Sequence, residues 1–372
     1  MNPVHPVQTI TLALATLVSL ALLSPVKAQD GIPDRISELH EWISLDAPPG
    51  REHLATDKIL LAMRGWKRDA LGNLMLRKGS GQPRRVVACA LDRPAFAVTE
   101  ITDDGYLRLR EIGAGRQHPL WVQFHEGQQI RVLTRGGPVD GVIIVKSTHL
   151  QRGRAAAPTT TLDDLWVDVG ATSKVEVRGL GIEMLDPVVR ASRAWFLGDF
   201  VSGHLASVRA GCAAIADASQ GKISKGETIF LFTTLRSFGH DGLEAALRSL
   251  GRVDEITLLE QSGENASSSE PYSERRIDKP PYLPESTGLT SLTILAPRVR
   301  FSGSLVESVQ LADFEKLLLA VERAAGVENE TTFHRTGFVA KTFQFSSEDT
   351  TANLLKSLAE IPSVSGHERP VR

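Results

Sequence analysis

A block of short β-like segments interrupts an otherwise alternating α/β pattern, and this order restricts the fold more than any other feature of the 372-residue sequence. Between residues 96 and 189, apolar runs such as FAVTEI and QIRVLT are separated by turn signals, among them Asp103-Asp104-Gly105. Many short strands joined by Gly-rich turns indicate a small barrel or sandwich. We therefore predict an α/β sheet domain flanked by helices, built from residues 29–95 and 190–340, with an all-β barrel domain inserted at residues 96–189.

The two flanking segments show helical and extended patterns in turn. Apolar spacing predicts a helix on each side of the Pro48-Pro49-Gly50 break, and further helices over residues 205–218, 243–250 and 311–325. Apolar runs predict strands over residues 74–77, 85–91, 228–234, 255–259 and 292–301. Residues 262–287 are polar and rich in Pro and Ser, which predicts a long loop. Within the insert, LWVQFH at residues 120–125 is one of the expected strands.

Charge and the N-terminal segment restrict the location of the protein. The formal net charge is -2, and no basic patch stands out, so the composition gives no reason to expect a nucleic acid or an anionic membrane as partner. Thr9 to Leu23 is apolar and uncharged, and Val26-Lys27-Ala28 follows it. A short apolar segment that ends in small residues predicts a signal peptide over residues 1–28 and an exported, periplasmic or secreted protein. An uncleaved anchor is the alternative.

The sequence contains two cysteines, Cys89 and Cys212. An exported location permits a disulfide. Neither residue belongs to a C-x-x-C motif, and both lie in apolar runs, where a buried free cysteine is usual. We expect two buried thiols rather than a bridge.

Several collinear motifs resemble one known family. Asp69 to Leu74 resembles a D-x-x-G-N-L turn, and Asp164-Leu165-Trp166-Val167-Asp168-Val169-Gly170-Ala171 resembles a D-L-x-I-D-x-G-A signature. These motifs are similar to those of the tetrahedral and glutamyl aminopeptidases, a group that also contains proteins labelled endoglucanases. The resemblance implies an α/β peptidase domain with an inserted barrel used for dimerisation. It also implies two divalent metal ions, zinc or cobalt, and removal of N-terminal residues from short peptides.

The positions that match the family's metal ligands carry other residues. The H-x-D motif corresponds to Ala90-Leu91-Asp92, so the histidine ligand is absent and the aspartate that would orient it remains. The A-L-D-D-R-x-G-C motif has Ser207 in place of the bridging aspartate, while Arg209 is retained.

The remaining ligand motifs differ in the same way. The Q-E-E-x-G motif has Arg236 in place of the catalytic glutamate and Ser237 in place of a glutamate ligand. The aspartate that ends the next strand corresponds to Glu260, and the histidine of H-T-P corresponds to Gly303. Alanine and glycine offer no donor atom, serine is a poor ligand for these metals, and arginine stays cationic.

We therefore expect a degenerate, non-catalytic copy with no bound metal or other cofactor and no catalytic residue. Its role would be assembly, regulation or peptide binding, with self-association through the insert. The alternative is an active metal-dependent aminopeptidase. We expect His204, His240, Asp199 and Asp241, which lie near the altered motifs, to be surface or loop residues. In a third possibility, Arg209 and Arg236 bind a carboxylate such as a peptide terminus, although structural arginines in salt bridges are also compatible with the pattern.

The C-terminal segment resembles a second beginning of the same domain. Asn353 to Glu368 is similar to the family's opening helix and S-G-x-E turn, an element already present at residues 35–52. We expect residues 341–351 to form a linker and residues 352–372 to begin a second, truncated aminopeptidase-like domain. A downstream active domain would then be a natural partner.

Overall fold

The computed structural model describes residues 34–113, 121–145, 159–191, 194–261 and 270–328. The predicted signal peptide, the predicted linker and the repeated opening element lie outside these residues. Within the described part of the chain, no helix is long and apolar enough to cross a membrane.

The centre of the sheet domain is a mixed 7-stranded sheet. Its strand order is β1 (Lys67–Arg68), β2 (Leu74–Ser80), β12 (Gly226–Thr233), β3 (Arg84–Ala90), β13 (Glu255–Leu259), β15 (Ser291–Pro297) and β14 (Tyr272–Asp278). The four inner strands, from β12 to β15, are parallel, and β2 and β14 pair antiparallel at the two sides. Parallel strands end at the same edge of a sheet, so the residues that follow β3, β12 and β13 lie close together.

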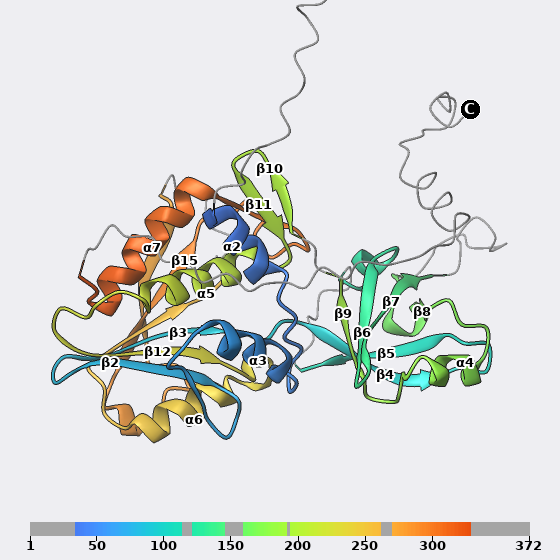
Figure 1. The fold of residues 1–372 in the computed structure, drawn as a ribbon, viewed down its shortest axis with the longest axis horizontal. Helices are drawn as coiled ribbons and strands as arrows, with labels where there is room; N and C mark the ends of the chain where they lie inside the picture. The colour runs from blue at the N-terminus through green and yellow to red at the C-terminus, as the bar shows by residue number, and fades with distance from the viewer. Residues whose placement is uncertain (1–33, 114–120, 146–158, 192–193, 262–269, 329–372) are drawn as a thin grey trace, which may run out of the picture. The chain divides into compact units, whose positions relative to one another are not determined.

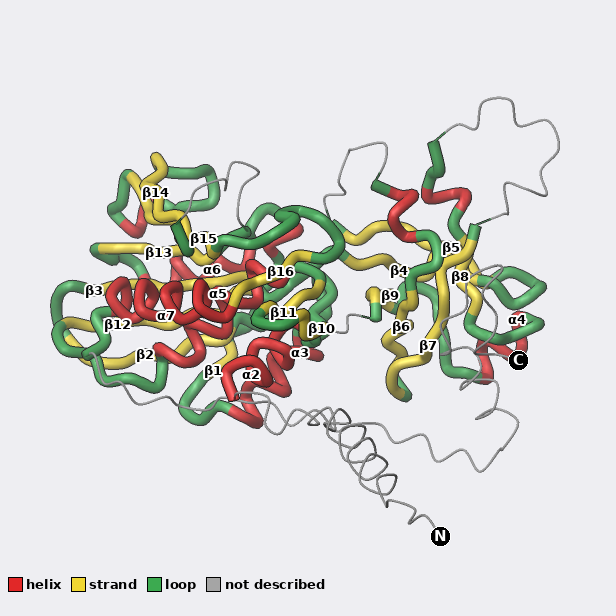
Figure 2. The backbone as a smooth tube through the Cα atoms, turned by 90° about the horizontal axis from the view of Figure 1, so that it is seen from above, coloured by secondary structure: helices red, strands yellow, loops and turns green. Residues whose placement is uncertain are grey.

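Helices cover both faces of this sheet (Figure 1). Helices α2 (Asp34–Ile43), α3 (His53–Ala62), α5 (Ala206–Ala218) and α7 (Leu311–Ala325) contribute to one buried cluster, which includes Trp42, Cys212 and Phe232. Helix α6 (Asp241–Leu250) packs on the other face against Ile229 and Leu231. Figure 2 shows α5 and α7 side by side over the strands. Every residue of α5 is buried, because the helix lies between the sheet and its neighbouring helices.

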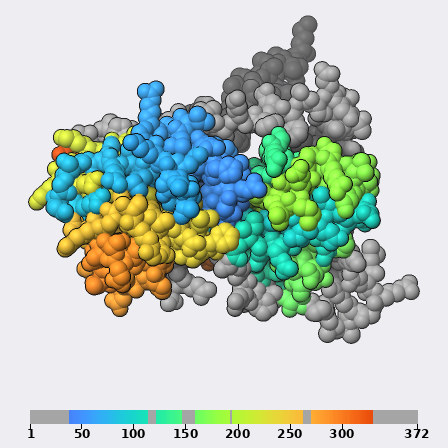
Figure 3. Space-filling model, turned by 90° about the horizontal axis from the view of Figure 1, so that it is seen from below, coloured from blue at the N-terminus to red at the C-terminus, as the bar shows by residue number. Residues whose placement is uncertain are grey.

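The inserted segment closes into a barrel. Its strand order is β4 (Ala95–Ile101), β5 (Leu107–Ile112), β8 (Trp166–Asp168), β7 (Gly137–Ile144), β6 (Gln129–Thr134) and β9 (Pro187–Arg190). The short helices η3 (Leu162–Asp164) and α4 (Lys174–Gly179) connect its strands. In Figure 3 the barrel surface comes from one continuous stretch of the chain, whereas the sheet domain combines early and late segments. The predicted fold class, an α/β domain with an inserted barrel, is confirmed.

The structure corrects three predictions of local structure. Residues 122–125 form the 3₁₀ helix η1 (Val122–His125) instead of a strand, because Trp121 and His125 are spaced for one face of a helical turn and both are buried. The predicted loop over residues 262–287 contains β14 and η5 (Glu285–Thr287). Strand β14 is a mostly exposed edge strand without apolar alternation, so its sequence resembles a loop. A 3-stranded sheet of β10 (Trp195–Leu197), β11 (Phe200–Gly203) and β16 (Glu307–Gln310) was not predicted.

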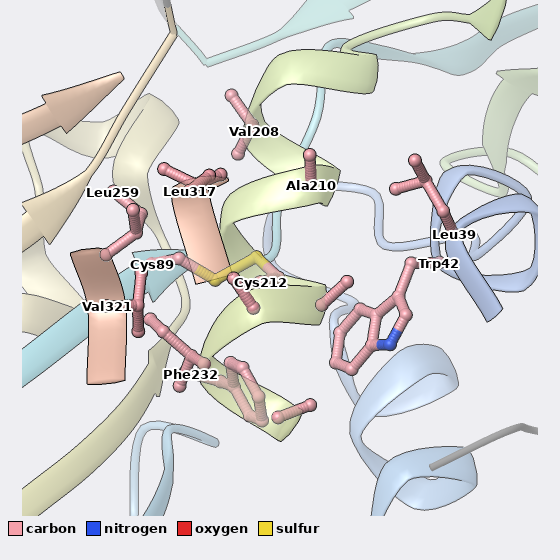
Figure 4. Close-up of a cluster of buried hydrophobic side chains, with 14 of the residues drawn as sticks. Leu39, Trp42, Cys89, Val208, Ala210, Cys212, Phe232, Leu259, Leu317 and Val321 are labelled. Carbon is pink, nitrogen blue, oxygen red and sulfur yellow. A yellow bond between two sulfur atoms is a disulfide. The ribbon is translucent and has the colours of Figure 1, made fainter. Parts of the chain in front are cut away.

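The expectation of two free thiols is wrong. Cys89 on β3 and Cys212 on α5 form a disulfide, with their Cα atoms 5.5 Å apart (Figure 4). The apolar residues around each cysteine in the sequence predict that the thiols are buried. They do not show that helix α5 packs directly on strand β3 and so brings the two cysteines together. The bridge is buried among Leu259, Leu317 and neighbouring core residues, and it fixes α5 to the central strand of the sheet.

Candidate functional site

The altered motif positions meet at the carboxyl end of the parallel strands. Ala90 is the last residue of β3, Arg236 and Ser237 follow β12 in the 3₁₀ helix η4 (Arg236–Phe238), and Glu260 follows β13. Ser207 lies in the first turn of α5, and Gly303 lies in the turn before β16. The predicted correspondence therefore brings together residues from distant parts of the chain at the usual place for an active site in such a sheet.

Asp92 binds the start of η4. One of its carboxylate oxygens accepts the backbone N–H of Arg236 at 2.9 Å. The other accepts the backbone N–H of Ser237 at 2.8 Å and its hydroxyl at 2.6 Å. A carboxylate at the first turn of a helix satisfies N–H groups that have no partner within the helix. Asp92 therefore holds η4 in place. The hydroxyl of Ser237, which the resemblance assigns to a ligand position, is engaged as a hydrogen-bond donor to Asp92.

Ser207 and Gly303 are joined through Glu307, which is fully buried on β16. The Glu307 Oε2 atom accepts the Ser207 hydroxyl at 2.6 Å and the Ser207 backbone N–H at 2.9 Å. The Oε1 atom accepts the Gly303 backbone N–H at 2.9 Å and the Gln261 side-chain amide at 2.7 Å. The start of helix α5 also favours negative charge at this place. The lone pairs of Glu307 are thus engaged by protein donors.

A small cavity lies among the remaining positions. Ala90, Arg236 and Glu260 line it together with apolar residues that include Val208 and Leu259, and its volume is about 10 Å³. Such a volume holds about one water molecule. The imidazole of His240 stacks on the Tyr282 ring, with centroids 4.1 Å apart. Burial lowers the pKa of His240, while burial and the Glu260 charge raise the pKa of Tyr282 to about 12.

Arg209 lies below this cleft and does not face it. Only 1% of the residue is exposed, and its guanidinium donates to the backbone oxygen of Leu45. Burial and the nearby Arg93 charge lower the pKa of Arg209 to about 9. Arg209 is therefore not placed to bind a ligand in the cleft beside Arg236, and the expected structural ion pair is also not observed for it within the described residues.

The four residues expected at the surface or in loops lie in turns, in a bend or at an exposed helix position, although two of them are not exposed. His204 is buried immediately before α5, and His240 is half-buried at the start of α6. Asp199 and Asp241 are not buried, and Asp199 lies in the turn between β10 and β11. The signal that could have indicated the burial of His204 is its position two residues before a helix of small residues, because such a helix packs closely on its neighbours and buries the residues at its start.

Sequence reasoning missed several polar residues that build the site. Glu307 accepts hydrogen bonds from Ser207 and from the Gln261 side-chain amide, and the buried Glu52 accepts the backbone N–H of Leu235 at 2.9 Å. Burial raises the pKa of Glu52. Leu205 and Leu235, the first residues of two altered motifs, have left-handed backbone angles, with φ of 56° and 57°. Such angles are unfavourable for leucine and concentrate at functional sites.

The side chains at this place do not fit a two-metal centre. Ala90 and Gly303 provide no side-chain donor, the hydroxyls of Ser207 and Ser237 donate to carboxylates, and Arg236 adds a positive charge. Over the residues that the structure describes, no group of three or more His, Cys, Asp or Glu side chains could hold a metal ion. Two divalent ions need several anionic or imidazole ligands.

The comparisons with known proteins agree with the fold. The family model for M42 glutamyl aminopeptidase matches residues 72–257, and the chain belongs to this family. In Escherichia coli, the putative aminopeptidase SgcX is 31% identical over 192 residues, which is 48% of this chain and 50% of SgcX. The lysyl aminopeptidase of Pyrococcus furiosus is 33% identical over 119 residues, 32% of this chain and 33% of that protein. The chain thus spans about half the length of SgcX, and less of the lysyl aminopeptidase.

Solved structures show the same fold. The aminopeptidase APDkam598 from the archaeon Desulfurococcus kamchatkensis superposes with a TM-score of 0.68 at 21% identity, covering 78% of this chain and 94% of that one. The TET1 peptidase of Pyrococcus horikoshii also gives a TM-score of 0.68, at 23% identity, covering 78% of this chain and 98% of that one. That peptidase can assemble into a tetrahedron or a large octahedral shell.

Proposed function

We propose that this chain is a non-catalytic member of the M42 family that acts by assembling with further copies of the same fold. The observation that supports this most is the donor set at the carboxyl edge of the sheet. The polar groups there are bonded to one another, and a cationic side chain stands at the position of the catalytic glutamate. Arginine cannot take a proton from water at physiological pH, so this cleft has no general base of the family type.

The self-associating surface that we propose is the barrel. Val175, Leu180, Met184 and Leu185 lie in or directly after α4, and all four are exposed apolar side chains. Exposed apolar residues that gather in one short segment favour a protein interface. The assemblies formed by the Pyrococcus horikoshii peptidase of the same fold support this role.

We also propose that the protein works in an oxidising compartment, as the predicted signal peptide implies. The Cys89–Cys212 disulfide supports this, because structural disulfides persist mainly in exported proteins. Mass spectrometry of the protein isolated from its source would test both points. A mature chain that begins at Gln29 and carries an intact bridge is expected, and a chain that retains Met1 with free thiols would contradict export.

A peptidase assay tests the absence of catalysis. The purified chain is incubated with short peptides that carry basic, acidic or apolar N-terminal residues, in the presence of zinc or cobalt. We expect no release of free amino acids above the level that remains when a chelator is added. Chelator-sensitive release that co-purifies with the chain through two separate chromatography steps would contradict the proposal.

Light scattering tests the assembly role independently. We expect the wild-type chain to have a mass several times that of one 40.4 kDa chain. Met184→Glu should shift it toward the monomer, because a buried carboxylate at an interface is costly. Leu61→Glu is the matched control, since Leu61 is 88% exposed on α3 of the sheet domain and should leave the mass unchanged. A monomeric wild type would rule out self-association.

A further inference from the structure

A second cavity lies at one end of the barrel, beside the altered motif that contains Ser237. Its volume is about 40 Å³, and its walls include Phe96, Glu111, Trp121, His125 and Arg190. His204 and the Ser237 side chain complete the lining from the sheet domain, and Ser237 is already bonded to Asp92. Apart from Ser237, the altered motif positions do not line this cavity.

His125 is buried in the cavity wall with both ring nitrogens unsatisfied. Only 3% of the residue is exposed, and neither Nδ1 nor Nε2 has a hydrogen-bond partner. Phe96 and Trp121 contact the ring edge-on, with centroids 5.0 Å and 5.5 Å from it. Burial and the Arg190 charge lower the pKa of His125 to about 4. The imidazole is therefore neutral at pH 7 and offers one N–H donor that nothing in the described chain accepts.

Arg190, at the end of β9, is an unpaired cation in the same cavity. Its Nη2 atom is buried without a hydrogen-bond partner, and no ion pair joins Arg190 to a carboxylate within the described residues. Burial and the nearby Arg93 lower the pKa of Arg190 to about 10, so the guanidinium remains charged at neutral pH. A buried cation without a partner is unfavourable, and an anion beside it removes that cost.

The surrounding charges do not neutralise Arg190. Asp46 forms ion pairs with both Arg93 and Arg131, at 2.9 Å and 2.7 Å, so that carboxylate is already shared by two cations. Glu111 is the acidic residue on the cavity wall. It accepts a hydrogen bond from the Trp121 side chain, and burial raises the pKa of its carboxyl group. The cavity therefore contains a cation with no ion-pair partner among the described residues, together with an unused N–H donor on His125.

We propose that this cavity binds the carboxylate group of a small molecule, with the oxygens accepting from Arg190 Nη2 and from the N–H of His125. The size favours a carboxylate over a tetrahedral anion. One water-sized atom needs a cavity volume of about 10–15 Å³, so a cavity of about 40 Å³ holds about three such atoms. A carboxylate has three non-hydrogen atoms and is planar, whereas phosphate and sulfate have five. The flat aromatic walls of Phe96 and Trp121 suit a planar group, and the remainder of the ligand extends through the open side.

Calorimetric titration of the full chain with sodium acetate at pH 7 tests the proposal, with sodium chloride as the ionic-strength control. We expect saturable acetate binding that weakens at least tenfold in Arg190→Met and in His125→Phe. Arg236→Met is the matched control, because Arg236 faces the altered metal cleft and does not line this cavity. Inorganic phosphate should bind at least tenfold more weakly than acetate.

A glycine titration distinguishes two sources of the carboxylate. Glycine that binds more tightly than acetate identifies an amino acid, with Glu111 holding the ammonium group, and the reverse order identifies a simple carboxylic acid. Both orders retain the carboxylate contact. The proposal is overturned if acetate does not bind, if it binds equally to Arg190→Met, or if phosphate binds as tightly.

A spectroscopic measurement keeps the test valid if the variants do not fold. In the wild-type chain labelled with ¹⁵N-histidine, the ring nitrogen resonances of His125 should move during the acetate titration, because one ring N–H gains an acceptor. The resonances of His53 serve as the reference, since His53 is exposed on α3. His125 resonances that stay fixed up to 50-fold excess acetate over protein would also reject the site.

Discussion

At the scale of single residues, Ser207 shows how the altered site is held together. The hydroxyl and backbone N–H of Ser207 both donate to the buried Glu307 carboxylate. A hydrogen bond to a charged group contributes more than one between neutral groups, and an unsatisfied buried carboxylate is costly. Ser207 therefore has a structural role at a position that the resemblance assigns to a metal ligand.

We predict that Ser207→Ala lowers the free energy of unfolding by about 2 kcal/mol, because Glu307 loses one donor. Chemical denaturation of the purified chain measures this. Ser304→Ala is the control, because the Ser304 hydroxyl is exposed and its hydrogen bonds are to the backbone oxygen and N–H of Val306, two residues along the chain. We expect the control to change stability by less than about 0.5 kcal/mol. Equal changes in the free energy of unfolding for the two substitutions would show that the contact with Glu307 stabilises the fold no more than an exposed hydroxyl contact does.

His125 predicts a pH dependence of stability. Its folded-state pKa is about 4, below the unfolded value of 6.5, so the unfolded chain binds more protons between these values. The stability is fully present above about pH 6.5 and falls as the pH drops toward 4. We expect this group to lower the free energy of unfolding by about 2 kcal/mol between pH 7 and pH 5. In His125→Phe this part of the loss should disappear. An identical pH profile for the two proteins would mean that His125 is not buried in its neutral form.

At the scale of elements, the disulfide joins the strand and the helix that carry two of the altered ligand positions. Cys89 precedes Ala90 at the end of β3, and Cys212 follows Ser207 on α5. In a metal-binding relative, ions would connect these two elements through their ligands. Here a covalent bond makes the connection in the core beneath the cleft.

We predict that the double substitution Cys89→Ala and Cys212→Ala lowers the free energy of unfolding by about 4 kcal/mol, as expected for a bridge that closes a loop of 123 residues. Denaturation with and without a reducing agent tests this. The wild type should lose a similar amount on reduction, and the double variant should not respond to the reductant. A wild type that is equally stable after complete reduction would contradict this role.

The sequence predicted the elements whose patterns are local and strongly periodic. Helix α7 begins and ends where its apolar spacing indicates, and the inserted barrel follows from its short strands and turns. Elements defined by distant partners could not be predicted. Strand β14 is polar because it lies at the edge of the sheet, and β16 is short and pairs with a strand more than 100 residues earlier. The disulfide was missed for the same reason, since it depends on the contact between α5 and β3.

The candidate site was predicted in its position but not in its bonding. Motif alignment placed Ala90, Arg236 and Glu260 together, and the structure brings them to one small cavity. The motifs gave no indication that Glu307 would be the buried acceptor for Ser207 and Gly303. The spacing of residues in a sequence does not show which hydrogen bonds form across a turn. The cavity beside His125 was also missed, since the segment that forms η1 was assigned to a strand.

At the scale of the whole molecule, the fold of an M42 aminopeptidase is retained around a cleft with different chemistry. The parallel strands end together, and Leu205 and Leu235, which begin two altered motifs, have left-handed backbone angles. At two positions that the resemblance assigns to metal ligands, the Ser207 and Ser237 hydroxyls donate hydrogen bonds to Glu307 and Asp92. Our account therefore separates the fold from the activity of the family, because fold alone does not determine function.

Elemental analysis of metals tests this claim most directly. The purified chain is incubated with excess zinc or cobalt, desalted and measured beside a variant that restores the family residues through Ala90→His, Ser207→Asp, Arg236→Glu, Ser237→Glu and Gly303→His. Our account predicts less than about 0.2 equivalents of either metal in the wild type, and more metal in the restored variant if it folds. About two equivalents of zinc or cobalt in the wild type, removed by a chelator together with peptide hydrolysis, would contradict it.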